Sequence, residues 1–177
     1  MSSAMSAWID TLAQQHLDAA YNLGRWLLGN EHDAADAVHD AYLRAARSAH
    51  TYAGGNARAW WLMIVRNCCL AKLATRKREL PLRPVDEAAV QAPDAPADAV
   101  EEQAHAAQCR ALLVAQLRAL PEEFRETLVL REMEDLSYRE IADVLGVPIG
   151  TVMSRLARGR ALLQRALSPA QESKHGL

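Results

Sequence analysis

A short segment near the carboxyl end of the chain combines hydroxyl side chains with arginines. Between residues 149 and 167 every basic residue is an arginine, and no aspartate or glutamate occurs. At 100° per residue, Thr151, Ser154 and Arg158 share one face of a helix, whereas the opposite face is aliphatic. Hydroxyls and guanidinium groups bind base edges, and further arginines can neutralise phosphates. The segment therefore indicates a helix that reads DNA.

The residues before this segment predict the first half of a helix-turn-helix motif. Ser137 and Glu140 have the spacing of a capping box that opens a short helix over residues 138–145. Gly146 is suited to end this helix in the left-handed conformation. The second helix would then enter the major groove of DNA. Its inward side would consist of Val152, Leu156, Gly159 and Leu163.

An ordinary helical hairpin with a solvated arginine face is the competing interpretation of the same residues. We favour DNA binding because a capping box, a glycine terminator, an aliphatic seam and an acid-free face occur together. Eight acidic residues lie between residues 122 and 143, before the second helix, and none lies within that helix, so charge is segregated along this part of the sequence. These acids are Glu122, Glu123, Glu126, Glu132, Glu134, Asp135, Glu140 and Asp143.

The composition restricts the class of protein. The 177 residues carry a formal net charge of −2, so any positive charge for nucleic acid must be local. Abundant alanine, leucine and arginine with few β-branched runs predict an all-α fold. Cys68, Cys69 and Cys109 form no metal-ligand spacing and no even disulfide set, which indicates a reducing compartment. No signal peptide or membrane-spanning run is recognisable, so we expect a cytoplasmic protein without membrane insertion.

The pattern along the chain predicts two small helical domains. The first domain covers residues 1–79, and helical periodicity runs through residues 6–79. Gly29 and Asn30 end one segment, and Asn56 is the expected N-cap of another. Residues 80–104 contain four of the seven prolines and six acidic residues against one arginine, which predicts an extended acidic linker. Residues 105–177 return to helical periodicity and contain the helix-turn-helix.

Two stretches of the chain resemble a known family. The stretch LPEEFRETLVLREMEDLSYREIADVLGVPIGTVMSRLARGRALL is similar to the C-terminal domain of bacterial RNA polymerase sigma factors of the extracytoplasmic-function type. The resemblance implies that this domain reads the −35 promoter element. Met153 departs from the family pattern, because many members are basic there. The implied base contacts are Thr151, Ser154 and Arg158, and the implied phosphate neighbours are Arg155, Arg160, Tyr138 and Arg139.

The stretch HDAADAVHDAYLRAARSAHTY and the following ARAWWLMIVRN resemble the N-terminal domain of the same family. The resemblance implies binding to the polymerase through Asp33, Asp36, Asp40 and Arg44. It also implies reading and melting of the −10 element by Tyr52, Asn56, Arg58, Trp61, Arg66 and Asn67. Trp60 shares a helical stripe with Ile64, so we expect Trp60 in the core and Trp61 at the surface.

The family resemblance also implies partners. We expect core RNA polymerase, through its β′ clamp helices and β flap, together with promoter DNA and an anti-sigma factor. No cofactor is implied. The acidic linker either follows the polymerase channel for nucleic acid, as in the family, or is a solubilising tether, and the two interpretations remain equally open.

Two other classes of function could use parts of the same sequence. A stand-alone helix-turn-helix regulator would need a dimerisation element, and no obvious one is present. A metal site or enzyme could use His32, Asp36, His39 and Asp40, but a solvated helix face explains these residues better. No phosphate loop, zinc-protease motif, dinucleotide fingerprint or nucleophile–base pair occurs. We therefore expect no catalytic residues and no metal.

Overall fold

The computed structural model describes residues 3–79 and 100–168, and all regular elements in these ranges are helical. The prediction of an all-α fold is confirmed. Most of the expected linker lies outside the described residues. Its last part does not, because α5 begins at Val100 and residues 100–104 are helical rather than extended.

The amino-terminal group of helices packs around small and aliphatic side chains. Helix α3 buries one stripe that includes Val38, Ala41 and Ala45, and it packs against α2 and α4. Asn56 caps α4 as expected, since its Oδ1 accepts a hydrogen bond from the amide of Ala59 at 2.9 Å. The elements are α1 (Ser3–Gln15), α2 (Leu17–Leu28), α3 (Glu31–Ser48), the 3₁₀ turn η1 (Ala49–Thr51) and α4 (Ala57–Glu79).

The carboxyl-terminal group contains the helix-turn-helix. Ser137 and Glu140 form the predicted capping box, and Gly146 ends α7 with φ of 65°. Val152, Leu156 and Gly159 are buried, so α8 is anchored by its aliphatic side. The elements are α5 (Val100–Ala119), α6 (Glu122–Leu128), the π-helical turn η3 (Val129–Met133), α7 (Tyr138–Leu145) and α8 (Ile149–Leu167).

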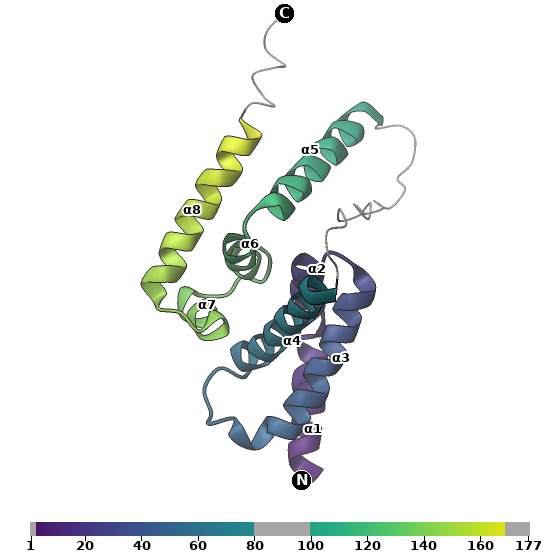
Figure 1. Ribbon diagram of the computed structural model, residues 1–177, viewed down its shortest axis with the longest axis vertical. Helices are drawn as coiled ribbons and strands as arrows, with labels where there is room; N and C mark the ends of the chain where they lie inside the picture. The colour runs from purple at the N-terminus through teal and green to yellow at the C-terminus, as the bar shows by residue number, and fades with distance from the viewer. Residues whose placement is uncertain (1–2, 80–99, 169–177) are drawn as a thin grey trace, which may run out of the picture.

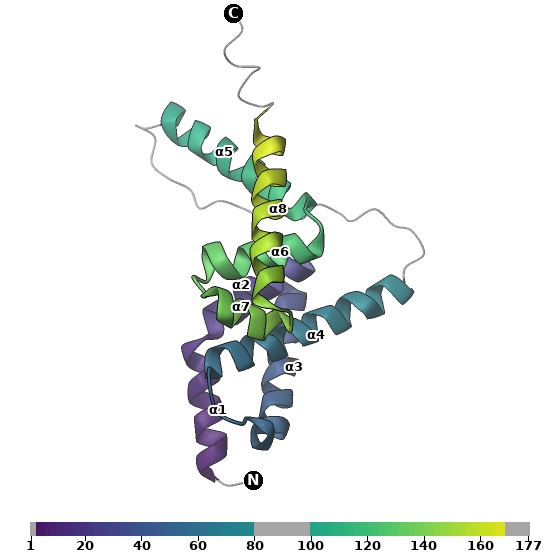
Figure 2. The same cartoon turned by 90° about the vertical axis from the view of Figure 1, so that its left-hand side faces the viewer.

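The two groups of helices are docked on each other. Figure 1 shows α6 and α7 at the junction, where α7 packs against α4 and α6 against α2. Buried side chains of the two groups form one continuous apolar cluster. Figure 2 shows α8 at the front of the carboxyl-terminal group. The sequence predicted two bodies joined by a tether, and it did not indicate this contact.

Candidate nucleic-acid interface

The outer face of α8 presents the side chains that the sequence assigned to base reading. Ser154 and Arg158 are exposed and Thr151 is half-buried. The hydroxyl of Ser154 donates to the carbonyl of Thr151 at 3.0 Å, and its oxygen can still accept a hydrogen bond. Met153, at 54% exposure, lies beside them. Two hydroxyls and a guanidinium on one rigid helix can hydrogen-bond base edges in a major groove.

The arginines that flank this face are engaged with carboxylates. Arg160 donates to Oε1 of Glu132 at 2.6 and 3.1 Å, and this hydrogen bonding raises the pKa of Arg160. Arg155 lies 3.6 Å from Glu126 and 3.9 Å from Glu123. Both arginines would have to exchange a carboxylate for a phosphate when DNA binds.

The two remaining residues assigned to phosphates lie on α7. Arg139 is exposed, whereas Tyr138 is half-buried. The guanidinium carbon of Arg131 lies 5.3 Å from the centroid of the Tyr138 ring. Arg139 can therefore reach a phosphate directly. Tyr138 is held in place by the cation–π contact and packs against the core.

The loop between η1 and α4 is fixed by an aromatic cluster. Tyr52 stacks on Trp8 with ring centroids 5.0 Å apart, and Trp60 lies 5.4 Å from Tyr52. The Tyr52 hydroxyl donates to the carbonyl of Gly55 at 2.6 Å, which closes the loop. Gly54 and Gly55 have φ of 91° and 97°, a conformation that strains residues with a side chain.

The expected roles of the two adjacent tryptophans are reversed in the structure. Trp61 is 1% exposed and packs in the core, whereas Trp60 is half-buried in the aromatic cluster. The buried stripe of α4 runs through Trp61, Val65 and Cys68, at intervals of four and three residues. The prediction that Trp61 stacks on an unpaired base is therefore wrong, and Trp60 is the tryptophan of this helix that solvent reaches.

The polar residues at the start of α4 contact the carboxyl-terminal group. The side-chain nitrogen Nδ2 of Asn56 donates to Oε1 of Glu140 at 2.6 Å. Nη2 of Arg58 donates to the carbonyl of Glu134 at 2.8 Å and lies 3.7 Å from its carboxylate. Asn56 and Arg58, both assigned to the −10 element, are thus hydrogen-bonded to the carboxyl-terminal group of helices.

Further along α4, Arg66 also contacts the carboxyl-terminal group, whereas Asn67 does not continue this pattern. Arg66 donates from Nε and Nη2 to both carboxylate oxygens of Glu126, at 2.7 and 2.9 Å. Asn67 is exposed. Local sequence patterns did not indicate these partners, because each pair joins residues 60 to 84 positions apart.

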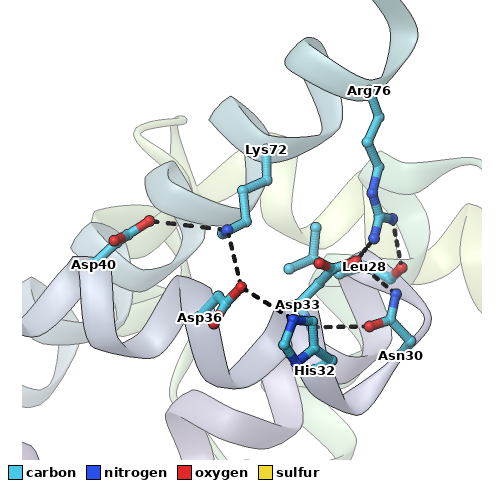
Figure 3. Close-up of polar contacts among 8 residues, drawn as sticks. All are labelled: Leu28, Asn30, His32, Asp33, Asp36, Asp40, Lys72 and Arg76. Carbon is cyan, nitrogen blue, oxygen red and sulfur yellow. Dashed lines mark hydrogen bonds and ion pairs between the residues drawn. The ribbon is translucent and has the colours of Figure 1, made fainter. Parts of the chain in front are cut away.

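The acidic face of α3 is partly covered by cations of α4. Lys72 lies 3.8 Å from Asp36 and 4.0 Å from Asp40, and Arg76 pairs with Asp33 (Figure 3). Asp36, Asp40 and Arg44 remain exposed, whereas Asp33 is half-buried. The segment assigned to polymerase binding therefore presents two accessible carboxylates and one arginine. The sequence did not indicate that Lys72 and Arg76 pair with the carboxylates of this face.

The suggested His/Asp cluster on α3 has a different partner. Nε2 of His32 lies 3.6 Å from Asp36, whose carboxylate also faces the ammonium group of Lys72. This carboxylate therefore already faces a cation, which it shares with Asp40. Within residues 3–79 and 100–168, no three histidine, cysteine or acidic side chains converge as metal ligands. No helix in these ranges is both long and apolar enough to span a bilayer.

Two family models match this chain. The model for Sigma-70 region 2 matches residues 12–79, and the model for Sigma-70 region 4 matches residues 110–163. The ECF RNA polymerase sigma factor SigM of Mycobacterium tuberculosis is 38% identical over 159 residues, covering 89% of this chain and 76% of that protein. This chain belongs to the ECF family of RNA polymerase sigma factors. The sigma-E factor of Escherichia coli is 30% identical, covering 77% of this chain and 75% of the relative.

Other similarities agree with this membership. SigE of Mycolicibacterium smegmatis is 38% identical over 94% of the chain, which spans 63% of SigE. The sigma factor RpoE of Bartonella quintana, solved with the anti-sigma factor NepR, has a TM-score of 0.70 at 23% identity, covering 90% of this chain and 96% of RpoE. CnrH, solved with the cytosolic domain of CnrY, has a TM-score of 0.60 at 22% identity over 94% of this chain and 96% of CnrH. Both likenesses concern the fold.

Membership in the family gives the two groups of helices their names. Helices α1 to α4 contain region 2, and α5 to α8 contain region 4. A sigma factor directs promoter recognition in transcription initiation and is not an enzyme. A stand-alone helix-turn-helix regulator is not favoured, because region 2 accounts for the amino-terminal domain.

Proposed function

We propose that this sigma factor joins core RNA polymerase in the cytoplasm and reads a two-part promoter with opposite ends of the chain. The outer face of α8 reads the −35 element through Thr151, Ser154 and Arg158. The observation that carries this proposal is the orientation of α8. Its aliphatic side is buried and its hydroxyl and guanidinium side is exposed.

Region 2 supplies the −10 reader in this proposal. Tyr52, Asn56, Arg58, Arg66 and Asn67 lie on the loop before α4 and on α4 itself. Trp60 replaces Trp61 as the aromatic surface against which an unpaired base can stack. Arginines along the helix can neutralise the phosphates of a separated strand. Because the aromatic cluster already orders this loop, DNA binding does not carry the entropic cost of ordering it.

In this proposal both domains contact the polymerase. The exposed part of the α3 face, with Asp36, Asp40 and Arg44, binds the β′ clamp helices, and region 4 binds the β flap. The similar protein RpoE was solved with the anti-sigma factor NepR, which supports an anti-sigma partner for this chain as well. We place the end of the first domain at residue 79 and the start of the second at residue 105. Helix α5 of the second domain begins five residues earlier, at Val100.

Transcription with purified components tests this function. Core polymerase and the purified chain are incubated with a pool of genomic promoter fragments, and transcript start sites are mapped. We expect start sites that depend on the added chain and share two spaced sequence elements. The double variant Ser154→Ala, Arg158→Ala should lose them, while core polymerase still elongates from a preformed RNA–DNA scaffold. No chain-dependent start site across the pool would contradict the proposal.

A further inference from the structure

Two large apolar side chains are exposed at the start of α8. Met153 is 54% exposed and Ile149 is 42% exposed. The two residues are four positions apart on one helix, so their side chains are neighbours on the same side of it. Single exposed hydrophobic residues are ordinary on a protein surface, whereas neighbouring ones form a patch. We call Ile149 and Met153 the apolar edge of α8.

The apolar edge borders the residues to which base reading is assigned. Ser154 follows Met153 directly, and both are exposed. Val152 and Leu156 are buried, so Met153 and Ser154 occupy adjacent parts of the surface that α8 leaves open. The Met153 side chain is longer than that of Ser154. DNA close enough to hydrogen-bond with Ser154 is therefore also within reach of Met153.

The first residues of α8 are ordered and accessible. The carbonyl of Pro148 accepts hydrogen bonds from the amides of Thr151 and Val152, at 2.9 and 3.2 Å. A Cβ on Gly150 would meet nothing within 4 Å, so the surface beside Ile149 is open. In helix-turn-helix proteins the first residues of the second helix contact base edges. The apolar edge therefore lies on the part of α8 that meets bases.

The chemistry of the apolar edge favours one base. In the major groove every base pair presents hydrogen-bond donors or acceptors, and only thymine adds an apolar group, its C5-methyl. An aliphatic side chain and a thioether offer no strong hydrogen bond, so they would desolvate a polar base edge without compensation. Against a thymine methyl group, the same side chains remove apolar surface from water on both partners.

We propose that Met153, supported by Ile149, reads the methyl group of a thymine in the −35 element. Ser154 and Arg158 read hydrogen-bonding groups of neighbouring base pairs, and Met153 adds a choice that those groups do not make. The thymine belongs to either strand, because both strands present their base edges in the major groove. The inference rests on the proposed function, from which it takes the docking of α8 on the −35 element.

The expected effect on affinity is small and confined to one position. Burying one methyl group strengthens binding roughly fourfold. A two-point contact between arginine and guanine discriminates more strongly, by about 5- to 150-fold. Met153 therefore sets the preference at one base pair, while the polar face of α8 supplies most of the discrimination.

Deoxyuridine isolates the methyl contact, because it lacks the C5-methyl group of thymidine and keeps the same hydrogen-bonding groups. A promoter is first selected from a randomised −35 library with holoenzyme that contains the full chain. Each thymine of the selected −35 element, on either strand, is then replaced by deoxyuridine, one at a time. Competition binding measures the affinity of the holoenzyme for each DNA. With the wild-type chain, one replacement should weaken binding roughly fourfold.

Three variants assign this loss to a side chain. Met153→Gln keeps a similar side-chain length but ends in an amide, so the loss at that thymine should disappear. Met153→Leu keeps an apolar side chain and should retain the loss. The matched control is Met133→Gln, because Met133 is 46% exposed and lies in η3, outside α8. The control should retain the loss in full. Helical circular dichroism shows that each variant is folded.

The outcomes separate this inference from the proposed function. Equal binding of thymine and deoxyuridine promoters by wild type at every position overturns the inference, and so does a loss that persists in Met153→Gln. Disappearance of the loss in Met153→Leu or in the Met133→Gln control also overturns it. Chain-dependent start sites that require Arg158, without any methyl effect, contradict the inference alone. Absence of chain-dependent start sites from the genomic promoter pool contradicts the proposed function.

Discussion

Arg66 on α4 and Glu126 on α6 form a two-point ion pair across the boundary between regions 2 and 4, with donor–acceptor distances of 2.7 and 2.9 Å. The pair joins residues 60 positions apart. Because Glu126 is buried, its charge depends on Arg66 and Arg155 for compensation. The docking of the two domains therefore includes a buried carboxylate that faces an arginine from each domain.

Replacing Glu126 should destabilise the chain much more than replacing an exposed partner. Glu126→Ala removes the buried carboxylate that compensates the charges of Arg66 and Arg155. Removing one partner of a buried ion pair typically costs about 3–5 kcal/mol of unfolding free energy. Glu132→Ala removes an exposed pair with Arg160 and should cost less than about 1 kcal/mol. Urea unfolding followed by circular dichroism measures both. Equal losses for the two variants would show that the Glu126 contacts are no stronger than surface pairs.

The adjacent tryptophans should respond differently to truncation. Trp61→Ala empties a site in the core and should cost about 3–5 kcal/mol. Trp60→Ala loses half-buried aromatic contacts with Trp8 and Tyr52, each worth roughly 0.5–1.5 kcal/mol. Its larger effect should be on promoter opening, measured by permanganate reactivity of −10 thymines. Greater destabilisation by Trp60→Ala than by Trp61→Ala would contradict the observed burial.

Two glycines of α8 should respond to alanine with opposite signs. A Cβ on Gly159 would lie 2.9 Å from Cδ1 of Leu128, so Gly159→Ala forces repacking and should cost about 1–3 kcal/mol. A Cβ on Gly150 meets nothing within 4 Å, so Gly150→Ala should stabilise the helix by up to about 1 kcal/mol. Thermal unfolding of the two variants decides the signs. A stabilising Gly159→Ala would show that α8 is not held close to α6.

The capping box predicts a pH dependence of stability. The backbone amide of Ser137 donates to Glu140, and this hydrogen bond, assisted by Asn56, holds the pKa of Glu140 below its ordinary 4.5. A depressed carboxyl pKa stabilises the fold above the ordinary value and ceases to do so as pH falls through the lowered value. The stability difference between wild type and Glu140→Gln should therefore be constant from neutral pH to about pH 4.5 and shrink below it.

Urea titrations at a series of pH values measure this difference. Asp143→Asn, an exposed change on the same helix, controls for the loss of one negative charge. A difference that stays constant on acidification would show that the charge of Glu140 does not stabilise α7.

Features set by neighbouring residues could be predicted from the sequence. The capping box at Ser137, the terminator at Gly146 and the outward face of α8 depend on contacts within a few positions, where helical geometry fixes the outcome. The all-α class follows from the same local preferences. The roles of Thr151, Ser154 and Arg158 in base reading remain predictions.

Features set by distant residues could not be predicted in this way. Trp60 and Trp61 differ by 100° on one helix, and the environment of Trp60 depends on Trp8 and Tyr52 from other parts of the chain. The contacts of Arg58 and Arg66 with glutamates depend on how region 4 docks on region 2. A solvated charge and a buried ion pair look alike in a sequence.

The outward face of α8 is tested most directly by promoter selection with the polymerase complex. Randomised −35 sequences are bound by holoenzyme containing wild type or Arg158→Ala and then sequenced. We predict that Arg158→Ala loses about 1–3 kcal/mol of discrimination at one base pair and leaves the other positions unchanged. A uniform loss on every sequence would show that Arg158 contacts only phosphate and would contradict base reading by this face.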